Sequence, residues 1–138
     1  MVEEPRSQGT PRRTAEKSNI KVYNRLVRDK MPDIIESMGN LAVYGVLDDT
    51  AFSKALLETM SRGAAQFAKT RSLELLADVL ECIDAWLEVS GLSMEEVERS
   101  KTERMKRCGT FHERVFLELV AEGGTADTTD TLLRNFHC

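Results

Sequence analysis

Two long stretches in the middle of the chain carry apolar residues at helical spacing. In residues 50–67 apolar side chains recur every three or four positions, at Phe52, Leu56, Leu57, Met60 and Ala64. Residues 72–91 are patterned more strongly, and their apolar face holds Leu76, Val79, Leu80, Ile83, Trp86 and Leu87. Such spacing places the side chains on one face of a helix. The pattern therefore predicts two long amphipathic helices.

Capping signals predict two further helices. A short helix is expected over residues 30–38, with Asp29 as its candidate N-cap. Another is expected from Ser93 to about Gly109, because Ser93 and Glu96 have the spacing of a capping box. This last helix is rich in charge and has few apolar residues.

Two brief extended segments and two polar ends complete the predicted organisation. Residues 41–47 and 115–119 contain short apolar or alternating runs, which favour a small paired β element. Residues 1–20 lack apolar periodicity, so we expect a disordered arm before one folded unit, residues 21–121. For residues 122–138 we expect a flexible tail, and the alternative is a short docking turn with Leu132, Leu133 and Phe136. The predicted fold is an all-α bundle of about four helices with a minor two-stranded β element.

Composition narrows the class of protein. The chain has 138 residues, which is the length of one domain with a single core. Its net charge of −4 argues against binding to a DNA or RNA duplex. No apolar run resembles a membrane span or a secretory signal, so no membrane partner is expected. Cys82, Cys108 and Cys138 fit neither a disulfide framework nor a zinc site, so we expect reduced thiols and a cytoplasmic protein.

A cluster of cations precedes the first predicted helix. The basic segment, residues 23–30, interleaves apolar residues with Asn24, Arg25, Arg28 and Lys30. This arrangement suits a polyanion such as a nucleoside triphosphate, because arginine makes strong, directional contacts with phosphate. In the alternative interpretation these side chains only cap the bundle and form ion pairs within it.

Acidic residues form a stripe on the second long helix. Glu74, Asp78 and Glu81 stand at i, i+4 and i+7, which puts all three on one side. Carboxylates that face one another across a bundle can hold magnesium together with substrate phosphates. The preceding helix offers Glu58 as a facing acid. The alternative is a solvated acidic face without chemistry.

Three separated motifs together resemble a known family. The basic segment with Met31 and Pro32, the run Leu76-Ala77-Asp78-Val79-Leu80-Glu81, and the region from Arg107 to Leu117 occur in the order found in the all-α nucleoside triphosphate pyrophosphohydrolase superfamily. These are the MazG-like proteins, related to phosphoribosyl-ATP pyrophosphohydrolase. The resemblance spans about residues 22–118.

The resemblance implies an α-helical homo-oligomer, a dimer or tetramer, that binds a nucleotide with Mg²⁺. Active members cleave the α–β phosphoanhydride bond to give a monophosphate and pyrophosphate. It implies Glu58 and Asp78 as catalytic residues and as metal ligands. Glu81 is the third predicted metal ligand, because it lies on the same stripe as Asp78. The substrate contacts that the resemblance implies are Asn24, Arg25, Arg28, Lys30, Arg107 and Phe111. For Phe111, in a predicted loop, a packing role is the alternative.

The acidic motif of the family is incomplete in this chain. The family carries Glu-Glu-x-x-Glu on one helix and Glu-x-x-Asp on the next, whereas three of the five positions here hold Thr59, Arg62 and Leu75. Two functions therefore stay open. One is a magnesium-dependent nucleotide pyrophosphohydrolase with a reduced acidic site. The other is a catalytically degenerate relative that acts as a nucleotide-binding or protein-interaction module.

Overall fold

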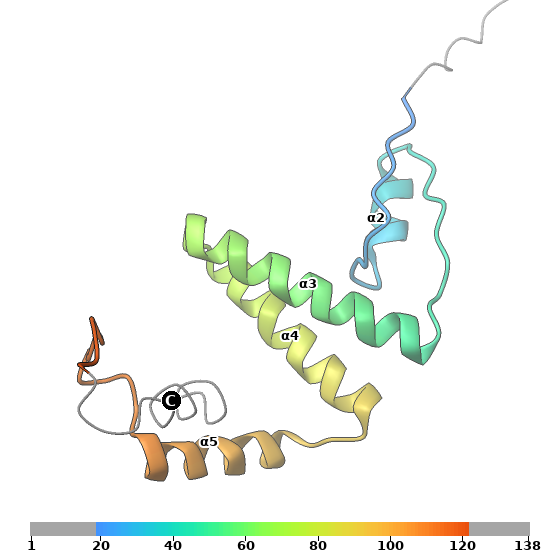
Figure 1. Cartoon of the computed structure of the whole chain (residues 1–138). Helices are drawn as coiled ribbons and strands as arrows, with labels where there is room; N and C mark the ends of the chain where they lie inside the picture. Colours follow the sequence, from blue (N-terminus) through green and yellow to red (C-terminus); the bar gives the residue numbers. More distant parts are fainter. Residues whose placement is uncertain (1–18, 122–138) are drawn as a thin grey trace, which may run out of the picture.

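The computed structural model describes residues 19–121 of the chain. Its helices are α2 (Met31–Ser37), α3 (Asp49–Thr70), α4 (Leu73–Ser90) and α5 (Met94–Cys108). Figure 1 shows α3 and α4 as an antiparallel hairpin, with α2 and the basic segment beside α3 and with α5 running separately beyond α4. The predicted all-α class is confirmed. The predicted arm and tail lie outside the described residues, apart from Asn19 and Ile20.

The small β element is the part of the predicted fold that is wrong. Residues 41–47 and 115–119 form no strand, and the described chain contains no strand elsewhere. Nearly all of their side chains are exposed. A two-stranded ribbon is marginal in water without further strands or a helix to cover it. The alternation of apolar and polar residues in these segments was therefore not sufficient to predict that they pair as strands.

The helix boundaries follow local capping chemistry. The Asp48 side chain accepts a hydrogen bond from the Ala51 backbone N–H at 2.9 Å, so α3 begins just before the predicted start. At α5 the predicted capping box is confirmed, since Ser93 Oγ and Glu96 each accept from the other's backbone N–H. For α2 the predicted cap is wrong, because Lys30 and not Asp29 occupies the N-cap position, without a side-chain hydrogen bond.

The hairpin of α3 and α4 contains the buried apolar residues of the described chain. These are Leu56 on α3, and Cys82 and Leu87 on α4. Gly63 is also buried, and a Cβ placed on it would lie 3.3 Å from Val79 Cγ2 of α4. The glycine thus lets the two helices approach closely at this point. Glycine is less favourable than alanine in a helix by about 1 kcal/mol, but at this position it allows the two helices to pack closely.

Two expectations from composition concern membrane crossing and the state of the thiols. None of the helices in the described residues has both the length and the apolar character that a membrane crossing requires. Cys82 is a free, buried thiol, whereas Cys108 is disulfide-bonded. The expectation of reduced thiols is therefore wrong for Cys108. Cys138 lies outside the described residues.

Candidate functional site

The basic segment follows an irregular path before α2. Asn24 has a φ of 45°, in the left-handed region that asparagine tolerates better than most residues. The backbone bends at Asn24, and the predicted ligand contact of this residue stays a prediction. Arg25, Arg28 and Lys30 are exposed. The three cations are therefore accessible from solvent.

Arg28 connects the basic segment to the acidic stripe. Its Nη2 donates a hydrogen bond to Asp78 Oδ1 of α4 at 2.5 Å, although 50 residues separate the two in sequence. The side chains are 59% and 43% exposed, respectively. A surface ion pair of this kind contributes little to folding stability and is screened by salt. The structure thus brings together two predicted site residues, and both stay open to a ligand.

An open hollow of about 320 Å³ lies at this contact. Its lining consists of Arg28, Glu74, Ala77 and Asp78. Glu74 was noticed on the acidic stripe but was not predicted as a site residue. The i, i+4 relation to Asp78 was the signal for it, because this spacing puts both carboxylates on one side of α4. The hollow therefore contains one guanidinium and two carboxylates.

The charges around the hollow act on one another. The hydrogen bond and the charge of Asp78 raise the pKa of the Arg28 guanidinium above its ordinary value, and Glu81 adds to the effect. Burial raises the pKa of the Cys82 thiol, and Asp78 raises it further. Cys82 is thus a protonated, buried part of the hairpin core rather than a nucleophile.

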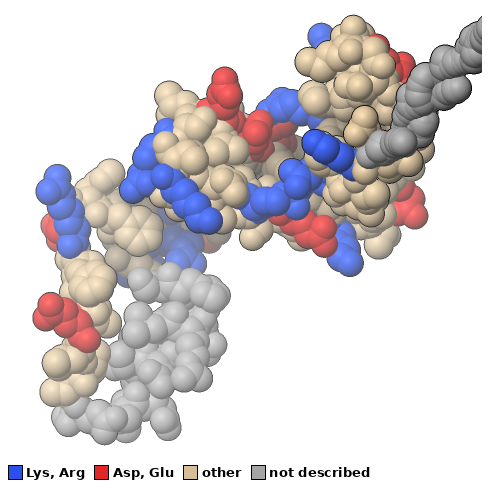
Figure 2. Space-filling view, turned by 90° about the horizontal axis from the view of Figure 1, so that it is seen from above, with Lys and Arg blue, Asp and Glu red and all other residues tan. Residues whose placement is uncertain are grey.

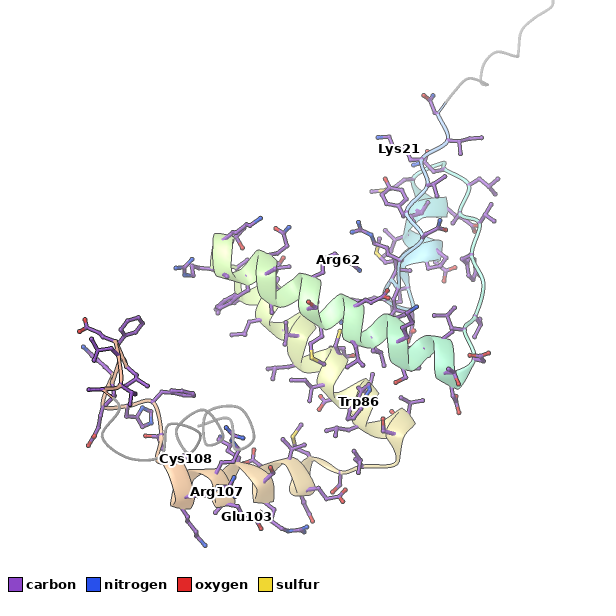
Figure 3. The ribbon with its side chains drawn as sticks, viewed as in Figure 1. Lys21, Arg62, Trp86, Glu103, Arg107 and Cys108 are labelled. Atoms are coloured by element: carbon purple, nitrogen blue, oxygen red, sulfur yellow. The ribbon has the colours of Figure 1, made fainter. Side chains whose placement is uncertain are left out.

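The predicted metal ligands are not assembled into a cluster. Glu58 and Glu81 are exposed, and neither lines the hollow. Across residues 19–121, no three His, Cys, Asp or Glu side chains are grouped so that they could hold a metal ion. Arg62, at a position where the family has an acid, projects from α3 on the side of α2 and the basic segment (Figure 3). Of the three predicted metal ligands, Asp78 alone lines the hollow, and the magnesium site stays a prediction.

Arg107 and Phe111, the remaining predicted substrate contacts, lie far from the hollow. Arg107 is near the end of α5 (Figure 3), and α5 is separated from the basic segment by the hairpin (Figure 1). Phe111 follows α5 and is exposed. Within one copy of the described chain, neither residue meets Arg28. The order of the motifs along the sequence does not indicate that these residues lie away from the basic segment.

Both signs of charge occur on the surface around the hairpin. In the view of Figure 2, Lys and Arg side chains gather in a band across the middle of the molecule, and Asp and Glu side chains lie on either side of it.

Comparisons with known proteins give no relative for this chain. No family model matches it, and no curated protein or solved structure was found to be similar. The functional argument therefore depends on the residues themselves and on their geometry.

Proposed function

We propose that this chain is a nucleotide pyrophosphohydrolase-like protein that hydrolyses the α–β phosphoanhydride of a nucleoside triphosphate or a related nucleotide. The products would be a nucleoside monophosphate and pyrophosphate. The observation that carries the proposal is the contact between Arg28 and Asp78, which joins the basic segment to the acidic stripe. A cation for phosphate and a carboxylate for water or a proton are the groups that phosphoanhydride hydrolysis uses.

Arg28 is the proposed phosphate contact. A guanidinium carries five N–H donors, and the Arg28 side chain is more than half exposed, so a phosphate can approach it from solvent. Arg25 and Lys30 are exposed on the same segment and add positive charge. When a phosphate binds, Arg28 exchanges the Asp78 carboxylate for a phosphate oxygen. The new charged hydrogen bond offsets the loss of the ion pair.

Asp78 and Glu74 are the proposed groups for the attacking water. Each carboxylate can orient a water molecule or accept its proton, and both line the hollow beside Arg28. Because the described acids do not form a metal cluster, we propose the magnesium complex of the nucleotide as the substrate, with Mg²⁺ arriving on the triphosphate. A nucleotide substrate is in keeping with a cytoplasmic protein, and we propose a homo-oligomer as the working unit.

A second candidate is a module that binds the nucleotide without hydrolysis. Asp78 already has Arg28 as a partner, and Leu75 and Arg62 stand where the family has acids. Such a site retains the phosphate contact and lacks the acids that catalysis normally needs. The two candidates share the ligand and differ in turnover.

Pyrophosphate release separates the two candidates. Purified chain is incubated with each common nucleoside triphosphate and Mg²⁺, and pyrophosphate and monophosphate are quantified. The enzyme proposal predicts turnover that Asp78→Asn abolishes, while triphosphate affinity is kept or increased because Arg28 loses a competing carboxylate. Binding without turnover in the wild type supports the module. If no triphosphate is either bound or hydrolysed, both candidate functions are contradicted.

Matched variants keep the assay specific. Asp84→Asn removes an exposed carboxylate from the same helix outside the hollow, and Lys54→Ala removes an exposed cation from α3. Neither change is expected to alter turnover or affinity. Equal losses in Asp84→Asn and Asp78→Asn would indicate a general charge effect instead of a site.

A further inference from the structure

The hairpin of α3 and α4 has two different faces. The close approach of Gly63 to Val79 marks the line along which the two helices meet. Arg62 on α3 and Asp78 on α4 each stand about 100° away from that line. Both lie on the side of the basic segment, since Arg62 projects toward it (Figure 3) and Asp78 binds Arg28. The residues rotated in the opposite sense therefore form a second face, turned away from the hollow.

The second face of the hairpin is apolar. On α4 it carries Leu73, Leu76 and Leu80, whose side chains are 75%, 39% and 56% exposed, and on α3 it carries Leu57, which is 47% exposed. Between residues 53 and 68 of α3 and between residues 73 and 83 of α4, this face contains no charged side chain. The apolar face, as we call it, consists of Leu57, Ala64, Ala68, Leu73, Leu76 and Leu80, which stand about 60–140° from the contact line.

Two helices cannot bury this face by packing on each other alone. The buried apolar residues of the described chain are Leu56, Cys82 and Leu87, all in the hairpin. Extensive helix packing within residues 19–121 is confined to α3 and α4. Helical bundles bury such a face against further helices, and monomeric proteins rarely leave an apolar patch of more than a few hundred Å² exposed. We therefore expect the apolar face to be covered by additional helices.

The size of the apolar face suits a second copy of the hairpin. The two helices have 22 and 18 residues, which correspond to lengths of about 33 Å and 27 Å. With the helix axes about 9 Å apart, the face has a flat area of about 500 Å². Two copies placed face to face bury about 1,000 Å² in total, which reaches the lower size of a specific interface.

Shape and charge favour one arrangement of the two copies. The central part of the apolar face has small side chains on α3 and leucines on α4, so each α4 fits over the α3 of the partner. Gly63 lies between Leu75 and Val79 along the hairpin, so Ala64 is level with Leu76. A two-fold axis parallel to the helices then places Leu76 over the partner's Ala64.

The edge of this arrangement pairs opposite charges. Asp84 of α4 and Lys54 of α3 are exposed and stand at the outer edge of the apolar face. Because each α4 lies over the partner's α3, Asp84 of one copy comes near the partner's Lys54, and the two-fold axis repeats the pair. Exposed pairs of this kind contribute little to affinity, but they favour one orientation over others.

We propose that the apolar face of the α3–α4 hairpin binds the same face of a second copy, so that the two hairpins form a four-helix bundle with each α4 over the α3 of the partner. The inference rests on the homo-oligomer proposed above and names its surface. The hollow at Arg28 and Asp78 lies on the opposite face and stays open in the dimer. Association is measured without nucleotide, so a failure of the interface can be distinguished from a failure of the proposed hydrolysis.

Sedimentation velocity on the full chain tests the interface. Ala64→Glu puts a charge into the apolar face, and we expect the dimer dissociation constant to rise about 100-fold or more because the charge would be buried unpaired. The matched control is Ala65→Glu, which adds the same charge about 100° further around α3, at an exposed position that points away from α4. This control is expected to leave the constant nearly unchanged. Far-UV circular dichroism and Trp86 fluorescence check that both variants are folded.

A cysteine cross-link tests the arrangement without adding charge. A mixture of Leu76→Cys and Ala64→Cys chains is expected to form a covalent dimer under mild oxidation, more readily than either variant alone or the wild type. Faster cross-linking of Leu76→Cys with itself would overturn the placement of α4 over the partner's α3. A wild type that is monomeric at high micromolar concentration would overturn the interface, as it would if another segment of the same chain covered the apolar face. Equal association of Ala64→Glu and Ala65→Glu would overturn it as well.

Discussion

Replacement of Gly63 tests the close approach of α3 and α4 that holds Asp78 in place. An alanine Cβ would lie 3.3 Å from Val79 Cγ2 and 3.8 Å from the Leu75 carbonyl oxygen. The half-buried Val79 side chain must then move by a few tenths of an ångström. Alanine gains about 1 kcal/mol in helix propensity, so we expect Gly63→Ala to change the free energy of unfolding by less than about 1 kcal/mol.

A larger side chain at this position should be clearly destabilising. Leucine adds three carbons beyond the Cβ between the helices, and overpacking of this kind costs about 1–3 kcal/mol. After the gain in propensity, we expect Gly63→Leu to lower the free energy of unfolding by about 1–2 kcal/mol, or the Tm by about 4–16 °C. The control is Ala65→Leu, which enlarges an exposed position of the same helix and should change stability by less than about 0.5 kcal/mol.

Urea titrations followed by Trp86 fluorescence and by circular dichroism measure these differences. Trp86 is the only tryptophan and lies on α4, so its signal reports on the hairpin. Val79→Ala combined with Gly63→Leu should recover part of the loss, in a non-additive way, because the two side chains share one space. If Gly63→Leu is as stable as Ala65→Leu, the helices do not approach closely at Gly63 and the reasoning is refuted.

Two further perturbations test local features of the fold. Ser93→Ala removes the capping box and is expected to destabilise α5 by about 1 kcal/mol, measured as faster hydrogen exchange in this helix. The unfolding transition reported by Trp86 fluorescence should shift little. A shift of that transition by the same free energy would mean that α5 packs on the hairpin. The Cys82 thiol has a pKa raised by burial, so the folded state keeps its proton while the unfolded state releases it above about pH 8.5. Stability should therefore fall as the pH rises from neutrality through that range, and Cys82→Ala should remove that part of the decrease; an unchanged pH dependence in the variant would contradict the assignment.

Local signals in the sequence were sufficient for the helices. The periodicity that ends at Gly91 predicted α4 well, because Gly91 adopts a φ of 71° that glycine tolerates without strain. The pair of Ser93 and Glu96 predicted the start of α5 and its capping chemistry. Such features depend on residues within one turn of each other, so they can be read without knowing the tertiary structure.

Long-range features could not be predicted in the same way. Nothing local indicates that Arg28 pairs with Asp78, or that Gly63 lies against Val79. The extended segment 115–119 had the pattern of a strand, but pairing requires a partner edge that the pattern does not specify. The region from Arg107 to Leu117 follows the basic segment in the order of the family motifs, yet α5 and the residues after it lie away from the basic segment (Figure 1). These outcomes depend on packing rather than on propensity.

The most direct test of the central claim is calorimetric titration of a nucleoside triphosphate, with Mg²⁺, into the wild type and Arg28→Ala. A charged hydrogen bond of the kind proposed contributes about 1.5–3 kcal/mol, so the affinity of Arg28→Ala should be at least about 10-fold lower than that of the wild type or of Lys54→Ala. Equal affinities in all three proteins would contradict the account, because Arg28 would then not contact the phosphates.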